Sequence, residues 1–392
     1  MLVSECALNW YGYCLHLDAH VSCSAQLLST LVTDLETPMK KHLIALAASA
    51  LISGIAMPVQ AQSSVTLSGL VDAYVGSMRM AGDAGRNTVV GSGGLTTSWW
   101  GVQGTEDLGG GLKASFLLNS FMRADTGIYG RFNGDPYFAR DANVSLAGSF
   151  GSLRLGRGTA PNFVPTILIN PFGDSFTFSP LVLHGNVNTA AWAYGTTPSD
   201  TGWSNGLAYT TPRFGGLTFT AQYQFGEQSS ATNNDNKKNV GINFIYIDGP
   251  WSAVGYYERD QISNPVAPGL LTTTVGGVAI PETKKTWMFG GAYDFTLVKL
   301  FLTYGGAKTD IADYDANTTS IGVKVPLGTG AVLGGIARTR VTGTFDGTRT
   351  TGTIGYDYYL SKRTDLYAMA MQDRVTNRSS GASYALGMRH RF

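Results

Sequence analysis

Cysteine is scarce in this sequence, and its few copies are confined to one end. The 392 residues include three cysteines, Cys6, Cys14 and Cys23, and none follows them. The part of the chain from Gln62 onward therefore has no disulfide framework, no thiol chemistry and no cysteine metal site.

Charge is also scarce, and neither sign dominates. Charged residues make up 14% of the sequence and aromatic residues 11%. A disordered chain would be charged and poor in aromatics, so a folded protein is expected. From Gln62 onward the chain has 26 basic residues (28 less 2) and 23 acidic ones (27 less 4), a net charge of +3. This weak bias argues against nucleic acid as a partner.

Long apolar runs and catalytic motifs are missing after residue 61. A membrane-spanning helix needs about 20 consecutive apolar residues, and no run approaches that length. The same region has two histidines, His184 and His390, and no G-x-S-x-G motif, whereas a hydrolase would need a serine or an acid paired with a histidine. We therefore expect no enzymatic activity and no cofactor.

One acidic stretch begins like a calcium-binding loop. Residues 310–317 offer three aspartates and an asparagine, but Thr318 stands where the required glycine would be. Lys324 stands where such a loop has its bidentate glutamate. A hydrated loop is favoured, and no metal is expected.

The segment from Met39 has the three parts of a secretory signal peptide. Lys40 and Lys41 form the positive n-region, residues 43–57 the apolar h-region, and residues 59–61 ("VQA") the small-residue cleavage site. A single membrane anchor is the alternative, but a polar stretch follows at once and no stop-transfer charges appear.

A signal peptide should begin a protein, yet 38 residues precede this one. We expect translation to start at Met39, with residues 1–38 a misassigned extension, residues 39–61 the signal peptide and residues 62–392 the exported domain. N-terminal sequencing of the precursor that found Met1 would refute this.

The exported part alternates between apolar and polar residues. In residues 217–225, "LTFTAQYQF", every second residue is apolar and the residues between them are Thr or Gln. Strict period two predicts a strand with one apolar and one polar face. Residues 239–246 and 320–325 repeat the pattern.

The connections between these strands also alternate. Short turns are expected at residues 106–112, 147–153, 211–217, 247–251, 294–299, 326–331 and 360–364. Longer polar or glycine-rich stretches occupy residues 79–92, 124–136, 158–188, 227–236 and 262–282. About 16 strands with short turns at one end and long loops at the other predict an all-β, antiparallel transmembrane β-barrel.

A soluble β-sandwich is the alternative that alternation alone leaves open. The expected strands run about 10 to 14 residues, whereas sandwich strands are usually about 5 or 6. Aromatic residues gather at strand ends, as at residues 356–359, which is typical of interfacial girdles. Strand length, aromatic placement and the signal peptide all favour the barrel.

Several stretches resemble the general porins of Gram-negative β-proteobacteria. The most specific is "WGVQGTEDLGGGLKASFLL" at residues 100–118. Four others are "SSVTLSGLVDAYV", "DANVSLAGSFGSLRLGRG", "NGLAYTTPRFGGLTFTAQYQFGE" and "YALGMRHRF". The resemblance covers the exported chain and implies a homotrimer of 16-stranded barrels in the outer membrane. It also implies a third loop folded into each barrel and a water-filled diffusion pore.

Residues 158–188 form the longest connection between strands, and they mix four prolines with a hydrophobic segment. A loop of this length and hydrophobicity needs a surface to pack against. A 16-stranded barrel is too wide for its own side chains to fill, so an inward fold would narrow the channel. We expect this segment to be the constriction loop; a surface loop over the trimer's outer face is the alternative.

Charged residues at the narrowest point would set the selectivity of such a pore. Alternation places Arg154 on the inner face, between Leu153 and Leu155. The other lumen residues expected are Arg157, Lys324, Arg338, Arg340, Arg374 and Arg389. Asp174 in the loop would supply the opposing negative charge.

The resemblance adds Arg140 as a constriction residue, although its parity matches the outward set unless a bulge shifts the register. Relatives usually carry an arginine where this chain has Trp99, and often an acidic residue where it has Asn119. We therefore expect a weak anion preference or a near-neutral conductance. A substrate-specific channel or an adhesin-type barrel remains the alternative, which single-channel conductance with candidate solutes would separate.

The final residues, 383–392, form a strand with one apolar and one arginine-bearing face. We expect this strand to pair with the first, because lipid does not tolerate an open sheet edge. The resemblance implies that Phe392 is the signal by which the barrel-assembly machinery inserts the chain. The expected partners are small hydrophilic solutes, inorganic ions, outer-membrane lipids, that machinery and further copies of the chain.

Overall fold

A computed structural model describes residues 64–186, 201–227, 237–264, 269–270, 272–275, 278–310, 313–343 and 346–392. These residues belong to one compact unit, Ala61–Phe392. The expected extension and signal peptide lie outside the described residues. So do residues 187–188 of the expected constriction loop and most of the expected loop at residues 227–236.

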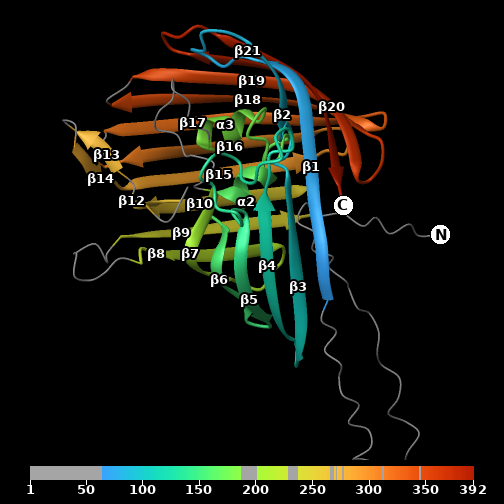
Figure 1. Ribbon diagram of the computed structural model, residues 1–392, viewed down its shortest axis with the longest axis vertical. Coiled ribbons are helices and arrows are strands. Elements are labelled where there is room, and N and C mark those ends of the chain that lie inside the picture. The colour runs from blue at the N-terminus through green and yellow to red at the C-terminus, as the bar shows by residue number, and fades with distance from the viewer. Residues whose placement is uncertain are drawn as a thin grey trace, which may run out of the picture. The chain divides into compact units, whose positions relative to one another are not determined.

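Sixteen long antiparallel strands form a closed wall in the described chain (Figure 1). They are β1 (Ser64–Met78), β3 (Trp99–Gly109), β4 (Leu112–Phe121), β5 (Asp141–Gly148), β6 (Gly151–Thr159), β7 (Gly202–Thr210), β8 (Leu217–Phe225), β9 (Lys238–Asp248), β10 (Trp251–Asp260), β15 (Lys284–Asp294), β16 (Lys299–Thr309), β17 (Tyr314–Leu327), β18 (Gly330–Gly343), β19 (Gly347–Tyr359), β20 (Thr364–Val375) and β21 (Gly381–Arg391). Each pairs with the next, and β21 pairs with β1. The predicted 16-stranded barrel is confirmed.

Short additional strands complete the connections. β2 (Asn87–Ser92) pairs with the second half of β1, while β3 pairs with its first half. The expected loop at residues 262–282 contains two small hairpins. Their strands are β11 (Ile262–Ser263), β12 (Gly269–Leu270), β13 (Thr272–Val275) and β14 (Val278–Pro281). Among the described residues no helix is long and apolar enough to cross a membrane.

The seven predicted short turns all join neighbouring strands at one end of the barrel. The opposite end carries the longer connections, as predicted, but three connections there are also short. They span residues 310–313, 344–346 and 376–380. The second half of the stretch that began like a calcium loop is strand, since β17 starts at Tyr314.

The predicted alternation is visible in β8. Phe219 and Phe225 are exposed on the outer face, while Gln222 and Gln224 are buried on the inner one. Amide side chains on the inner face and aromatic ones on the outer face are what a membrane barrel with a polar interior requires.

The connection between β6 and β7 folds into the barrel, as expected. It contains α2 (Phe163–Leu168), which packs against β9 and β10, and α3 (Pro180–Asn186), which packs against β17, β18 and β19. Figure 1 shows both helices on the concave side of the sheet. We call its described part, residues 160–186, the inner loop.

The inner loop buries apolar side chains against the wall. The cluster consists of Phe172, Phe178 and Leu183 of the inner loop, Leu95 of the connection between β2 and β3, and Ala331, Leu333, Tyr367, Met369, Met371 and Ala385 on the strands. The inner face of β18 and β20 is therefore apolar where the inner loop covers it.

The barrel closes between its last and first strands, as predicted. β21 pairs with β1 from Leu70↔Arg391 to Ser77↔Tyr384. Phe392 extends the seam, because its backbone N–H donates to the Gly69 carbonyl (3.0 Å) and its carbonyl accepts from the Gly69 N–H (3.1 Å). A side chain on Gly69 would collide with the Phe392 ring.

Candidate pore lining

One part of the wall, β3 to β8, has a polar inner face. Asn119 and Asn143 lie on it beside Gln222 and Gln224. Three hydrogen bonds join α3 to the opposite wall, from His184 to Thr339 and Thr351 and from Arg349 to the Leu183 carbonyl. We call β3–β8 the bare wall, and β9 to β20 the covered wall.

Trp99 faces the lumen from the bare wall. It lies opposite Leu70 of β1 and Phe121 of β4, which are both buried on the inner face. The Arg140 guanidinium lies over the Trp99 ring, 4.1 Å from its centroid, and 5.8 Å from that of Phe121. A cation held over an indole face is attracted by the negative face of the ring.

The outward direction that strand alternation suggested for the Arg140 side chain does not apply. β5 begins at Asp141, so Arg140 is the last residue of the preceding connection, and strand alternation does not fix its direction. The Asp141 carboxylate accepts from Asn119 Nδ2 at 2.9 Å and lies 3.7 Å from Arg140 Nε. Relatives usually carry an arginine at the position of Trp99. Here the Trp99 ring instead supports the guanidinium of Arg140.

Arg154 lies on the inner face of β6, between the exposed Leu153 and Leu155. Its Nη2 donates to Gln222 Oε1 and to the Thr159 carbonyl, each at 3.2 Å. The inward direction of Arg154 agrees with the predicted alternation, and Arg140 lies on the same wall; their role at a constriction stays a prediction.

Arg157 is enclosed rather than open to solutes, and its expected lumen position is corrected. It lies opposite Ala142 on β5 and is 6% exposed. Its Nε donates to the Ala139 carbonyl (2.6 Å) and its Nη1 to Ser204 Oγ (2.8 Å). These bonds fasten the segment before β5 to β7, at the site of the register shift between β6 and β7.

Three further predictions are wrong, because Arg338, Arg340 and Arg374 lie exposed on the outer face. Arg338 and Arg340 share the parity of Ile336, which is 48% exposed, whereas Ala337 is fully buried on the inner face. Alternation misled here because the inner loop covers this wall. Both faces of β18 and β20 are largely apolar, so the polar residues do not mark the lumen.

Arg389 does face inward, but its charge is satisfied. Its Nε lies 3.0 Å from Asp365 Oδ1 and its Nη2 3.3 Å from Asp357 Oδ2, while Nη1 donates to Thr96 Oγ1 at 2.8 Å. The residue is 3% exposed. Lys324 is also on the inner face, with its Nζ 6.0 Å from the centroid of the Tyr359 ring. Both lie toward the turn end of the barrel.

Asp174 lies in the inner loop and is 6% exposed. Burial raises the pKa of its carboxyl, while the positive charges of Arg140 and Arg389 lower it. Its Oδ1 has no hydrogen-bond partner in the described chain. The Asp174 carboxyl is therefore withdrawn from solvent, whereas Arg140 and Arg154 are partly exposed.

Sequence reasoning missed the polar clamp that holds α3. Arg349 on β19 is fully buried, with its Nε 3.0 Å from Asp373 Oδ1 and its Nη1 donating to the Leu183 carbonyl at 2.9 Å. His184 lies between the hydroxyls of Thr339 (2.7 Å) and Thr351 (2.8 Å). Burial, and then the charge of Arg349, lowers the pKa of His184 well below its usual value, so the ring is neutral.

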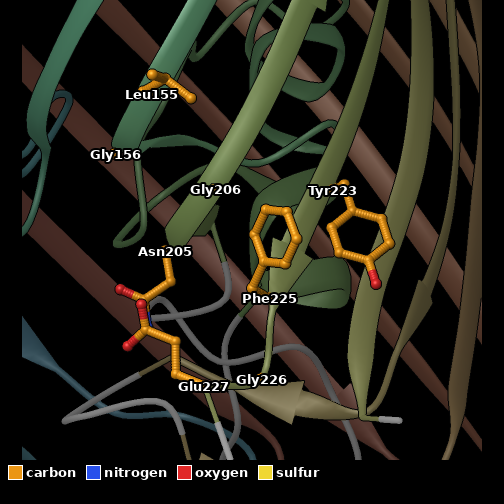
Figure 2. A pocket seen from close by; sticks show the side chains of 8 residues that line it. All are labelled: Leu155, Gly156, Asn205, Gly206, Tyr223, Phe225, Gly226 and Glu227. Carbon is orange, nitrogen blue, oxygen red and sulfur yellow. The ribbon is translucent and has the colours of Figure 1, made fainter. Parts of the chain in front are cut away.

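An open pocket of about 470 Å³ lies on the outer face, away from the lumen. Figure 2 shows Phe225 and Tyr223 beside it, with Asn205 and Glu227 at its edge. Leu155 and Phe225 are both exposed outer-face residues. This pocket belongs to the membrane-facing surface and is not part of the solute path.

The sequence matches the profile of the Gram-negative porin family over residues 45–378. It is 35% identical over 342 residues to outer membrane porin protein 32 of Delftia acidovorans, covering 84% of this chain and 88% of that protein. It is 28% identical over 413 residues to an outer membrane porin protein of Bordetella pertussis, covering 90% and 100%. The solved anion-selective porin from Comamonas acidovorans aligns with a TM-score of 0.69 and 29% identity, covering 84% of this chain and all of that one.

Proposed function

Because the chain belongs to the Gram-negative porin family, we propose that its pore prefers anions weakly and that Arg140 and Arg154 set this preference. It is an outer-membrane β-barrel through which small hydrophilic solutes and ions diffuse passively. Its fold is that of a channel rather than an enzyme. The weak anion preference, and its assignment to Arg140 and Arg154, go beyond what membership of the family establishes.

One observation carries the proposal: Arg140 is held over Trp99 on the bare wall, while Asp174 opposite is buried. A cation at the narrow part of a pore raises the local concentration of anions. Asp174 is withdrawn from solvent, whereas the Asp141 carboxylate, 3.7 Å from Arg140 Nε, offsets part of the Arg140 charge, which is why the proposed preference is weak. The related structure from Comamonas acidovorans is described as anion-selective, which agrees with this direction.

Reversal potentials in a salt gradient across planar bilayers test the proposal. The wild-type channel should show a modest anion preference, and Arg140→Gln should move the potential toward the nonselective value. Arg374→Gln is the matched control, because Arg374 is an arginine on the outer face and should leave the potential unchanged. Strong cation selectivity of the wild-type channel would sink the proposal.

The assembly partners are part of the same proposal. The chain forms a homotrimer, lipids surround its exposed apolar outer face, and the barrel-assembly machinery inserts it through Phe392. The contact between Phe392 and Gly69 supports a role for this residue in closing the barrel. Deleting Phe392 should block insertion but leave export intact; a normal yield of trimer in the outer membrane would refute this.

A further inference from the structure

Two arginines form one row with a threonine on the outer face of the barrel. Arg338 on β18 lies directly opposite Thr350 on β19, and Thr350 lies directly opposite Arg374 on β20. Residues directly opposite one another in antiparallel strands share a face, with Cβ atoms about 5 Å apart. Two guanidinium groups and a hydroxyl therefore project together, away from the lumen.

Neither arginine has a partner among the residues that the structure describes. No ion pair or hydrogen bond involves the Arg338 or Arg374 guanidinium there, and both residues are exposed. Lys308 on β16 is also an exposed cation of the outer face, yet its Nζ lies 4.0 Å from Asp315. The row is thus a positive site without a counterion, whereas Lys308 has one.

The row of Arg338, Thr350 and Arg374 lies at the edge of the outer apolar band that is nearer the loop end of the barrel. On β18 the outer-face residue before Arg338 is Ile336, and Ile354 faces outward on β19; these two are 48% and 60% exposed. Arg338 follows Gly330, the first residue of β18, by eight positions. At about 3.3 Å per residue and a tilt of about 40°, this is about 20 Å along the barrel axis, near the top of a band about 25 Å tall.

A guanidinium at this height has a limited choice of partners. It is next to lipid rather than to the pore, and its long side chain reaches up to the headgroup layer. Arginine binds phosphate with paired, charge-assisted hydrogen bonds, and the Thr350 hydroxyl adds a third donor between the two arginines. Nothing in this arrangement suits a solute in the lumen, because the row faces the other way.

We propose that Arg338, Thr350 and Arg374 bind the phosphate group of an anionic lipid in the leaflet at the loop end of the barrel. The site is distinct from the pore and does not depend on the channel's selectivity. It would hold a phosphorylated lipid headgroup at a fixed place on the rim of β18–β20.

Lipid binding to the purified, folded barrel tests the site. Native mass spectrometry in detergent with EDTA would compare two probes: diphosphorylated lipid A and the same lipid after enzymatic dephosphorylation. The wild-type barrel should bind the phosphorylated form at least about tenfold more tightly, since charge-assisted bonds are lost without phosphate. Equal binding of the two lipids would overturn the proposal.

Variants of the row test which residues cause the preference for the phosphorylated lipid. Arg338→Gln/Arg374→Gln should abolish it, Thr350→Val should weaken it, and Lys308→Gln, the matched control, should leave it intact. All these residues lie on the outer face, and an unchanged unfolding temperature would show that each variant folds. A double variant that keeps the preference, or a loss of equal size in Lys308→Gln, would overturn the assignment.

Two further arms separate other sources of the same signal. Inorganic phosphate at the lipid's concentration should not displace lipid A, and equal displacement would show a site for free phosphate instead. The oligomeric state of the double variant should match that of the wild type. An altered oligomer with unchanged lipid binding would assign the row to a contact between copies of the chain and contradict the proposal.

Discussion

The bare wall and the covered wall use the same strand geometry with opposite chemistry inside. On β8 of the bare wall the inner face carries Gln222 and Gln224, which face a polar interior. On β20 of the covered wall the inner face carries Tyr367, Met369 and Met371, which pack under the inner loop. The inner loop packs on the apolar side chains of β20, whereas the amides of β8 bond to other polar side chains, Gln222 to Arg154 and Gln224 to Asn264.

The largest effect is expected from breaking the polar clamp under α3. Arg349→Ala would leave Asp373 as a buried carboxylate without its guanidinium partner, which costs about 3–5 kcal/mol. The inner loop should detach from β19, because Arg349 also holds the Leu183 carbonyl. Urea unfolding of the purified barrel, followed by tryptophan fluorescence, measures the loss.

Arg374 provides the control for the clamp between Arg349 and Asp373. Arg374→Ala removes an exposed outer-face arginine next to Asp373 in the sequence, and its free energy of unfolding should change by less than about 0.5 kcal/mol. Equal losses in Arg349→Ala and Arg374→Ala would show that the two faces of this wall do not differ as described.

The next effect separates the apolar and polar inner faces. Met369→Ala in the covered cluster should cost about 2–5 kcal/mol, because it leaves a cavity under the inner loop. Gln222→Ala on the bare wall removes one hydrogen bond to Arg154 and should cost about 1 kcal/mol. Comparable values for the two variants, measured by the same urea titration, would contradict the contrast.

A smaller effect concerns the platform under Arg140. Trp99→Leu removes the aromatic face and should release the Arg140 guanidinium. The cation–π attraction lost in this way is worth about 0.5–2 kcal/mol. The anion preference should fall, though less than in Arg140→Gln, because the charge remains in the lumen. Reversal potentials of the two variants give the order, and a preference unchanged in Trp99→Leu would refute the platform.

The smallest effect is a pH dependence from Asp174. Its pKa is raised chiefly by burial, so the carboxyl takes up its proton at a higher pH than an exposed aspartate does. Below this pKa the negative charge near Arg140 is gone, and the anion preference should therefore increase as the pH falls through it. Asp174→Asn should show the low-pH preference at every pH; a wild-type preference that decreases on acidification would reject this sign.

The sequence was sufficient for the barrel because strand alternation and short turns are local properties. Residues 217–225 and the seven turns follow from neighbours in the chain, and the seam follows from the need to close the edge. The face of Arg338 and Arg374 was not predictable in this way, because the apolar inner face beneath them depends on Phe172 and Leu183, far along the chain.

The site itself was predicted only in part. Arg154 follows from alternation, and Arg140 was named through resemblance alone. The stacking of Arg140 on Trp99 depends on where β5 begins, which alternation does not define. The enclosure of Arg157 depends on a register shift between β6 and β7, and the satisfaction of Arg389 on two carboxylates from neighbouring strands. Such cross-strand contacts require the register of the whole sheet.

The measurement that tests the two-wall description most directly is cysteine accessibility in the open channel. The chain has no cysteine from Gln62 onward, so single substitutions can be labelled cleanly. Ser145→Cys lies on the inner face of the bare wall, and Ala337→Cys lies on the inner face of the covered wall. A charged, water-soluble thiosulfonate added during single-channel recording should block Ser145→Cys and leave Ala337→Cys unchanged. Rapid block of Ala337→Cys, or none of Ser145→Cys, would contradict the placement of the pore along β3–β8.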